Sequence, residues 1–570
     1  MAKREFKYVG HSVARVDGLE KVTGQAKFVG DITVPGMLYG RILRSTYPHA
    51  RIRSIDASQA EALPGVVAVL TAADIADLNP IYNGRPVIAM NKVHYIGEPV
   101  AAVAAEDLAT TEEALSLIHV DYEELPSVVG IEAAIKPGAP LVHDDKAGNI
   151  GTHEKVTRGN VDEGFAQSDV IVEDHFTFPM VYHYAMEPHS AIAHYDENEI
   201  TVWSSAQHPF QVRGDIAKIF KVPAAKVRLI INYLGGGYGS KSYTKFEPLV
   251  VALARKAKRP VRICNSVGES MVTVRRHGAR VRIKTGAKSD GTIVAREAEI
   301  YLDTGGYDDN GPQVTARSAT RVLGPYWIPN IRTNAYQVYT NTGSAGSYRA
   351  IGAPQVIYAG ESQIEILAAN LGMDAAELRA KNLLTKGQEL RPGLKGIDAN
   401  LASSLKTLVR ESHWKKSLRK RNSAVGMGTA EVDIDRDTGA VTLKKFISVA
   451  DVGKAIHPEH CVAQEEGAAM QGIGHTFFEQ LIYDNGQLIN QNLIDYRIPT
   501  FSEVPEEFHT VLVENGDGPG PYGVRGMAEG GILSVAPAVC NAIDRATGVR
   551  IRDLPLTPER VWRALRDAGK

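Results

Sequence analysis

Cysteine is scarce in this sequence, and its scarcity excludes several kinds of metal site. The 570 residues include three cysteines, Cys264, Cys461 and Cys540, which lie far apart along the chain. An iron–sulfur cluster usually takes four thiolates, and structural zinc sites usually contain C-x-x-C pairs. We therefore expect neither on this chain alone. An odd, sparse set also predicts no disulfide framework and fits a reducing compartment.

Excess charge and long apolar runs are also missing. The chain has 64 Lys and Arg against 66 Asp and Glu, a formal charge of −2. A nucleic-acid binder would need a basic field, so that class is not expected. The longest apolar runs, such as Val100–Ala105 between Glu98 and Glu106, are too short to span a bilayer. The first ten residues contain no apolar stretch, which predicts no secretory signal and a cytoplasmic location.

The length predicts three or four domains, and the periodicity predicts an α+β fold class with large mixed sheets. In the first part, a buried strand at Ala101–Ala104 precedes a helix at Thr110–Ile118 and a strand at His119–Tyr122. Residues 125–149 are rich in Pro, Gly and Asp without periodicity, which indicates a linker.

After residue 151 the pattern changes to long strands joined by turns, with helices between them. Two hairpins are expected, one from residues 281–285 and 292–302, the other from residues 431–434 and 441–449. Helices are expected at 354–370, at 374–384 with Asp374 as N-cap, and near the C-terminus with Thr557 as N-cap. Residues 385–423 form a second candidate boundary. Their basic stretch, residues 413–422, is interpreted as a solvated helix face rather than an anionic-partner patch.

The densest glycine cluster, LGGGYGSK at Leu234–Lys241, follows a strand-like run. Such glycines bring backbone N–H groups close to a ligand or simply form a tight turn. A phosphate-binding P-loop needs Gly where Ser240 stands, and a dinucleotide fingerprint fails at the same position. A nucleotide-dependent enzyme is therefore a disfavoured alternative.

Two further loops carry glycines, NTGSAGSYRAIGAPQ at residues 341–355 and YGVRGMAEGG at residues 522–531. The second places one acid, Glu529, among small residues just before an apolar helix at 535–543. This carboxylate is either a general base or an exposed turn residue.

Two histidine groups raise the question of a metal site. His183, Glu187 and His189 have a spacing that could chelate zinc, and His457 and His460 are also close. A proline interrupts each group, so neither forms a helical metal-binding pattern. We interpret them as structural or exposed histidines.

Taken together, the motifs occur in a specific order. Along the chain they read RVDGLEKVTGQAKFVGDI, YPHARI, YIGEPVAAV, SSAQHPF, GGGYGSK, TNTGSAGSYRAIGAPQ, CVAQEEGAAMQGIGHTFFEQ, VRGMAEGG and NAIDRATG. From about Arg15 to Leu565 this order resembles the molybdenum-binding (large) subunit of the xanthine dehydrogenase/aldehyde oxidase family. The resemblance implies an α/β-hammerhead-like domain at 1–126, a linker at 127–150, a first molybdopterin-binding domain at 151–395, and a truncated second one at 396–570.

The resemblance also implies a cofactor and a set of site residues. In that family molybdenum is held through the dithiolene of a pterin, usually the cytosine dinucleotide form in bacteria, and by no side chain. Glu529 matches the catalytic glutamate, which acts as the base. The matching cofactor-binding positions are Gln207, Gly237, Tyr238, Gly239, Arg349, Ala350 and Gln464.

Three positions match the substrate side of the family's site: Ser242, Arg317 and Ile351. Ser242 stands where xanthine-oxidising members carry a glutamate, which argues against a purine substrate. Ala350 stands where carbon monoxide dehydrogenases carry a copper-binding cysteine, which argues against that activity.

The implied activity is oxidative hydroxylation of an aldehyde or of an electron-poor (hetero)aromatic carbon. Water supplies the oxygen, and electrons leave to a [2Fe-2S] subunit and an FAD subunit. The chain is a shortened form, since after Val425–Gly428 it lacks a subdomain with a G-Q-G loop and a serine-rich loop. The alternative is a non-catalytic or incomplete scaffold that needs a complementing chain to bind the pterin.

Overall fold

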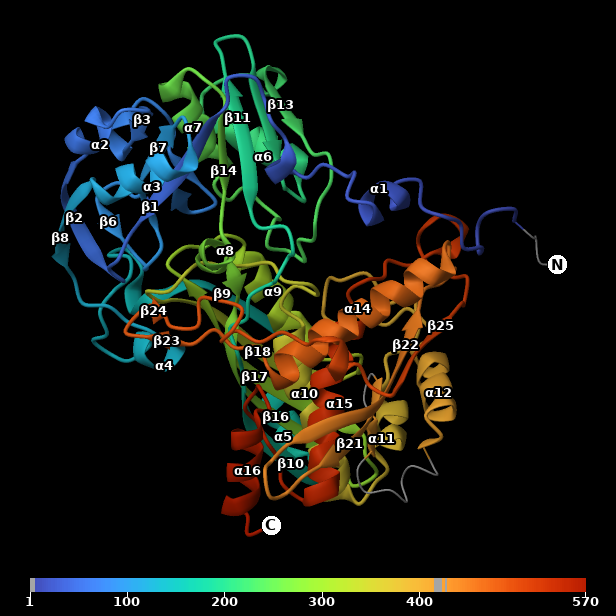
Figure 1. Cartoon of the computed structure of the whole chain (residues 1–570). Helices are drawn as coiled ribbons and strands as arrows, with labels where there is room; N and C mark the ends of the chain where they lie inside the picture. The colour runs from blue at the N-terminus through green and yellow to red at the C-terminus, as the bar shows by residue number, and fades with distance from the viewer. Residues whose placement is uncertain (1–5, 415–422, 426–427) are drawn as a thin grey trace.

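The chain folds into two lobes of mixed helices and strands, which confirms the α+β class (Figure 1). The computed structural model describes residues 6–414, 423–425 and 428–570. All three cysteines are free. In these described ranges we find no helix with the length and apolar character needed to cross a membrane.

The smaller lobe is built on a seven-stranded sheet whose order is β13-β12-β11-β14-β1-β7-β3. Every residue of β7 is buried, which confirms the strand expected there. The sheet takes strands from before residue 127 and from after residue 150, because β1 pairs in parallel with β14 through Leu38 and Val261. Its strands are β1 (Leu38–Arg44), β3 (Val66–Leu70), β7 (Pro99–Ala105), β11 (Ser190–Tyr195), β12 (Ile200–Ser204), β13 (Val227–Ile230) and β14 (Val261–Cys264).

Short helices and two small sheets complete this lobe. The expected helix and returning strand are confirmed as α3 and β8. The helices are α1 (Gly18–Val22), α2 (Ser58–Ala62), α3 (Leu108–Ser116), α6 (Pro209–Ile219) and α7 (Glu247–Ala257). The small sheets contain β2 (Ala50–Asp56), β6 (Lys92–Val93) and β8 (His119–Glu124), and β4 (Ile81–Tyr82) with β5 (Arg85–Pro86).

The larger lobe contains a five-stranded sheet and a four-stranded sheet. Both expected hairpins are confirmed, as β16–β17 and β21–β22. The five-stranded sheet contains β10 (Val170–Phe178), β16 (Gly278–Ala287), β17 (Ile293–Gly305), β18 (Asn330–Tyr339) and β9 (Ile150–Arg158). The four-stranded sheet contains β20 (Ser423–Val425), β21 (Gly428–Ile434), β22 (Val441–Asp451) and β25 (Glu507–Val513).

Helices α10 and α15 pack against each other between these two sheets and share one hydrophobic core with them (Figure 1). The helices of this lobe are α4 (Ile131–Ala134), α5 (Val161–Ala166), α8 (Val267–Thr273), α9 (Gly311–Arg321), α10 (Pro354–Leu371), α11 (Ala375–Asn382), α12 (Leu401–Glu411), α14 (Pro458–Phe477), α15 (Gly531–Thr547) and α16 (Pro558–Asp567). Two short pairs remain, β15 (Arg275–Arg276) with β19 (Ala345–Gly346), and β23 (Tyr483–Asp484) with β24 (Gln487–Leu488).

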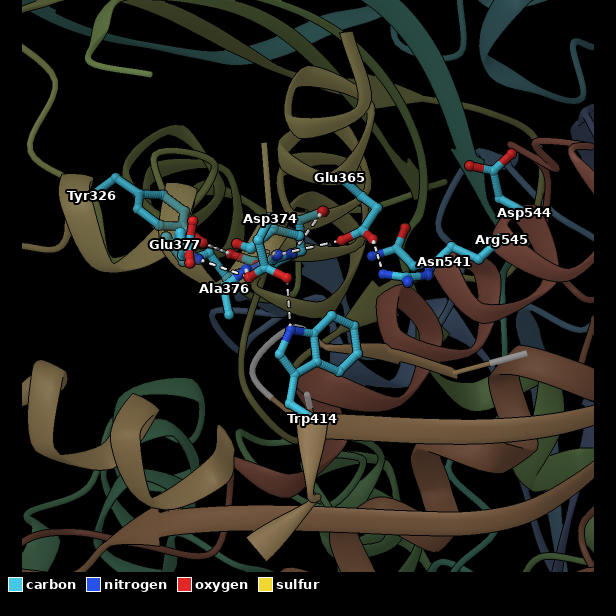
Figure 2. Close-up of polar contacts among 12 residues, drawn as sticks. Tyr326, Glu365, Asp374, Ala376, Glu377, Trp414, Asn541, Asp544 and Arg545 are labelled. Atoms are coloured by element: carbon cyan, nitrogen blue, oxygen red, sulfur yellow. Dashed lines mark hydrogen bonds and ion pairs between the residues drawn. The ribbon is translucent and has the colours of Figure 1, made fainter. Parts of the chain in front are cut away.

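Both expected helix caps are present. Figure 2 shows the Asp374 carboxylate accepting hydrogen bonds from the amides of Ala376 and Glu377 and from Trp414 Nε1 at 2.9 Å. Thr557 Oγ1 accepts from the amide of Arg560. The residues of the basic stretch from 415 to 422 lie outside the described part of the chain.

We predict that substitutions at Gly40 of β1 and Ile263 of β14 have non-additive effects on stability in a double-mutant cycle. A Cβ on Gly40 would lie 2.6 Å from Ile263 Cγ1, so Gly40→Ala overpacks the sheet by about 1–3 kcal/mol. Ile263→Ala leaves a cavity that costs about 2–5 kcal/mol. The double variant should lose less free energy of unfolding than the two single variants lose together, because the new methyl group at position 40 enters the space that Ile263 vacates. Urea unfolding measures all three, and strict additivity would contradict the contact.

Candidate active site

The glycine loop Leu234–Lys241 is wedged between Gln207 and the loop that contains Ser347. Gln207 Oε1 accepts a hydrogen bond of 3.0 Å from the amide of Gly239. A Cβ on Gly239 would lie 2.4 Å from the carbonyl oxygen of Ser347, so only glycine fits there. The next residue back, Tyr238, has φ +53°. The loop is therefore part of a close-packed site and not merely a turn.

The lysine in this loop is buried and paired with a glutamate. Lys241 is 2% exposed, and its Nζ donates to Glu187 Oε2 at 2.7 Å. The same oxygen accepts from the amide of Gly235 at 2.8 Å. The ammonium group of Lys241 is already paired with Glu187 inside the protein, so it does not point toward a phosphate. This geometry argues against a nucleotide-dependent enzyme.

The histidines of the first group, His183 and His189, contact backbone carbonyl groups of two glycine-containing loops. His183 Nε2 lies 2.6 Å from the carbonyl oxygen of Ser347, and His189 Nε2 lies 3.1 Å from that of Ser240. Burial lowers the pKa of each histidine to about 3, so both are neutral and donate to these carbonyls. Where the structure describes the chain, no group of three or more His, Cys, Asp or Glu side chains could hold a metal ion.

The second histidine group anchors the N-terminal segment. The rings of His457 and His460 stack at the start of α14, with centroids 3.6 Å apart. His457 Nε2 lies 2.8 Å from the carbonyl oxygen of Val13. This group therefore joins residues near the N-terminus to α14.

The second loop, residues 341–355, contacts both the glycine loop and Glu529. The amide of Arg349 donates to the carbonyl oxygen of Tyr238 at 2.8 Å. The amide of Ala350, a residue with φ +64°, donates to Glu529 Oε1 at 3.1 Å. Glu529 Oε2 accepts no hydrogen bond from the described residues, and the residue is exposed. Among the described residues, one carboxylate oxygen of Glu529 thus accepts a hydrogen bond from Ala350, and the other has no hydrogen-bond donor.

The side chain of Arg349 reaches the third loop and helix α14. Its Nε donates to the carbonyl oxygen of Ala528, a residue with φ +99°. One terminal nitrogen donates to the carbonyl oxygen of Gln464 at 2.8 Å and to its Oε1 at 3.1 Å. The other donates to Gln471 Oε1 at 3.2 Å. A single guanidinium therefore joins segments that are more than 100 residues apart in the sequence.

Charged side chains surround this arginine. Glu465 is 3% exposed, and burial raises the pKa of its carboxyl while the charge of Arg349 opposes that change. Burial lowers the pKa of the Arg349 guanidinium, which Glu465 in turn raises. Burial and the nearby charge of Arg317 lower the pKa of Arg321, whereas Glu529 raises it. Helix α9 therefore places Arg321 within electrostatic range of both Arg317 and Glu529.

The structure brings the predicted catalytic and cofactor residues together. The members of this group are Gln207, Gly237, Tyr238, Gly239, Arg349, Ala350, Gln464 and Glu529. Of the substrate positions, Ser242 is buried behind the glycine loop, Ile351 is half-buried, and Arg317 is exposed on α9.

Sequence reasoning missed Gln471, Glu465 and Arg321. Gln471 could have been found, because it follows Gln464 by seven residues and so lies on the same face of a helix. The other two depend on tertiary contacts that have no local signal.

A cavity of about 920 Å³ lies beside the glycine loop. Its lining includes Phe28, Tyr39, Met186, Arg262 and Tyr238. Tyr238, 39% exposed, is common to this cavity and to the cluster around Glu529. The volume is that of a site for an organic cofactor or a small molecule.

Comparison with known proteins matches three parts of the chain to known domains. Residues 23–126 match the a/b hammerhead domain of aldehyde oxidase and xanthine dehydrogenase. Residues 142–383 and residues 340–505 each match a molybdopterin cofactor-binding domain.

Individual relatives and solved structures agree with these matches. The nicotinate dehydrogenase large molybdopterin subunit of Eubacterium barkeri is 38% identical over 395 residues, which cover 68% of this chain and 92% of that protein. A probable xanthine dehydrogenase subunit of Bacillus subtilis is 39% identical over 386 residues, 67% of this chain, and the match spans 51% of its length. The aldehyde oxidoreductase from Desulfovibrio gigas, at 23% identity, has the same fold, with a TM-score of 0.91 over 99% of this chain and 82% of that one.

The Eubacterium relative is covered almost over its full length, and the domain matches follow the order implied by the motifs. The chain therefore belongs to the xanthine dehydrogenase/aldehyde oxidase family, as a molybdenum-binding subunit with molybdopterin cofactor-binding domains.

Proposed function

We propose that this chain is the catalytic subunit of a molybdenum hydroxylase that acts on an aldehyde or on an electron-poor (hetero)aromatic carbon. One observation carries the proposal. Five segments between residues 207 and 529 converge so that the Ala350 amide holds one oxygen of the Glu529 carboxylate, while the other accepts no hydrogen bond from the described residues. Such a carboxylate, set among backbone amides and carboxamides, is suited to general-base chemistry.

The donor set fits a molybdenum–molybdopterin group held by its organic part. Gln207 and Gln464 each have Oε1 engaged, by Gly239 and by Arg349, which leaves each Nε2 to donate toward the cofactor. The loops around Tyr238–Gly239 and Arg349–Ala350 bring backbone to the same place. The cavity of about 920 Å³ beside the glycine loop shares Tyr238 with this site and has the volume of a site for an organic group. When bound, this group supplies two-electron oxidation at the substrate carbon with water as the oxygen source.

We assign separate roles in proton uptake, cofactor binding and substrate binding to residues of this chain. Glu529 Oε2 takes up a proton, while its Oε1 remains on the Ala350 amide. Gln207 Oε1 is engaged by Gly239, which leaves its Nε2 to donate toward the cofactor. We assign Arg317 and Ile351 to the substrate side because they match the family's substrate positions. The amide of Ser242 donates to the carbonyl oxygen of Gly239 at 3.1 Å and so supports the glycine loop.

The fuller assembly is part of the same proposal. It comprises the cytosine dinucleotide form of the cofactor, a [2Fe-2S] subunit, an FAD subunit and a cytoplasmic location. The three dispersed free cysteines support a cluster on another chain. Because Gln464 and Glu529 are exposed, we also propose a further chain that covers this face and completes the cofactor site. The same exposure favours the alternative, an incomplete scaffold.

We predict about one molybdenum per chain in protein purified from its host with its partners attached. Purification with partners attached keeps the chain that is proposed to complete the cofactor site, so the metal should be retained with its pterin. Elemental analysis measures the content. A folded, partnered protein without molybdenum would contradict the catalytic function and leave the scaffold.

We predict that Glu529→Gln lowers kcat by about 10²–10⁴-fold and leaves KM within a few-fold. Glutamine preserves the shape and the contact with Ala350 but removes the base. Steady-state kinetics of the complex give both constants, with Glu506→Gln at an exposed surface ion pair as the control. If Glu529→Gln retains activity at the level of the control, Glu529 is not the base.

A further inference from the structure

The Arg349 side chain makes contacts that the cofactor-binding role of its backbone does not explain. Its guanidinium donates to the carbonyl of Ala528, to the carbonyl and side chain of Gln464, and to the side chain of Gln471. We propose that Arg349 is a positioning residue that fixes the Glu529 carboxylate relative to the glycine loop. This inference rests on the proposed function of Glu529 as the base.

The backbone just before Glu529 needs a restraint. Ala528 has φ +99°, a conformation that costs a non-glycine residue free energy and persists only when its surroundings fix it. The Ala528 carbonyl that accepts from Arg349 Nε lies in the same rigid peptide plane as the Glu529 nitrogen. Rotation of that peptide would turn the Cα of Glu529, so the hydrogen bond to Arg349 sets where the carboxylate points.

The backbone of Arg349–Ala350 contacts the carboxylate end of Glu529. The amide of Ala350 donates to Glu529 Oε1 at 3.1 Å, and the amide of Arg349 donates to the carbonyl of Tyr238 at 2.8 Å. Arg349–Ala350 therefore grips the backbone before Glu529, its carboxylate and the glycine loop at once. Displacing this segment would separate the base from the cofactor-side loop.

Only a guanidinium can make this set of contacts. Its planar fork presents donors to Ala528, Gln464 and Gln471 in three directions, whereas a lysine offers one ammonium at the end of a flexible chain. Arg349→Lys should keep the charge beside Glu465 but lose part of the geometry. The positioning role thus predicts graded effects, with Lys between Arg and Met.

The first test uses hydrogen–deuterium exchange on the full chain without added cofactor. In Arg349→Met, amides in residues 524–531 and the amide of Ala350 should exchange at least tenfold faster than in the unsubstituted chain, and Arg349→Lys should fall between. Arg158→Met is the matched control, because Arg158 in edge strand β9 also donates to two carbonyl oxygens, those of Ile328 and Glu389. It should leave these segments unchanged.

The second test uses kinetics of the purified complex. Arg349→Met should lower kcat about 100-fold with KM within threefold and molybdenum content unchanged, and Arg349→Lys should recover part of the loss. Unchanged exchange together with kcat within threefold of the unsubstituted enzyme would overturn the proposal. Loss of molybdenum in parallel with kcat would also overturn it, because Arg349 would then retain the cofactor rather than position the base.

The two proposals fail in different ways. If the unsubstituted complex has no molybdenum or no hydroxylase activity, the proposed function fails, and the exchange experiment still decides whether Arg349 holds the Glu529 loop. If Arg349→Met does not fold, Arg349→Lys carries both tests. Wild-type exchange and kcat in that variant would then count against the proposal.

Discussion

The packing of α10 against α15 is the constraint on which the site depends. The loop that carries Arg349 and Ala350 runs directly into α10, and the loop that carries Glu529 runs directly into α15. The two helices bury their apolar faces against each other between two sheets. Because close-packed helices cannot slide freely, this core sets the separation between the Ala350 amide and the Glu529 carboxylate. Helix α14 joins α15 at Gly472, where a Cβ would lie 2.6 Å from Val535 Cγ2, and so brings its carboxamides within reach of Arg349.

The smaller lobe supplies the glycine loop and Gln207, and buried polar contacts hold the glycine loop and the loop that contains Ser347 in place. His183 and His189 are neutral because burial disfavours their charged form, and each donates to a carbonyl of one of the two site loops. The pairing of Lys241 with Glu187 fixes the end of the glycine loop. These contacts use the motif residues whose spacing had suggested zinc or phosphate, so their chemistry is structural.

The sequence alone determined the local elements and the family resemblance. Hairpins such as β16–β17 follow from alternation and turn residues, and the caps at Asp374 and Thr557 follow from side chains that reach neighbouring amides. The ordered motifs predict Gln207, Gln464 and Glu529 as site residues from their positions in the sequence.

Only the tertiary structure decided which distant groups meet. The pairing of β1 with β14 and the contacts of Arg349 with Ala528, Gln464 and Gln471 join residues separated by more than 100 positions. The tertiary structure also decides that Lys241 pairs with Glu187 and that Ser242 is buried. The physical reason is that such contacts arise from the packing of helices and sheets, which residue spacing along a single chain does not encode.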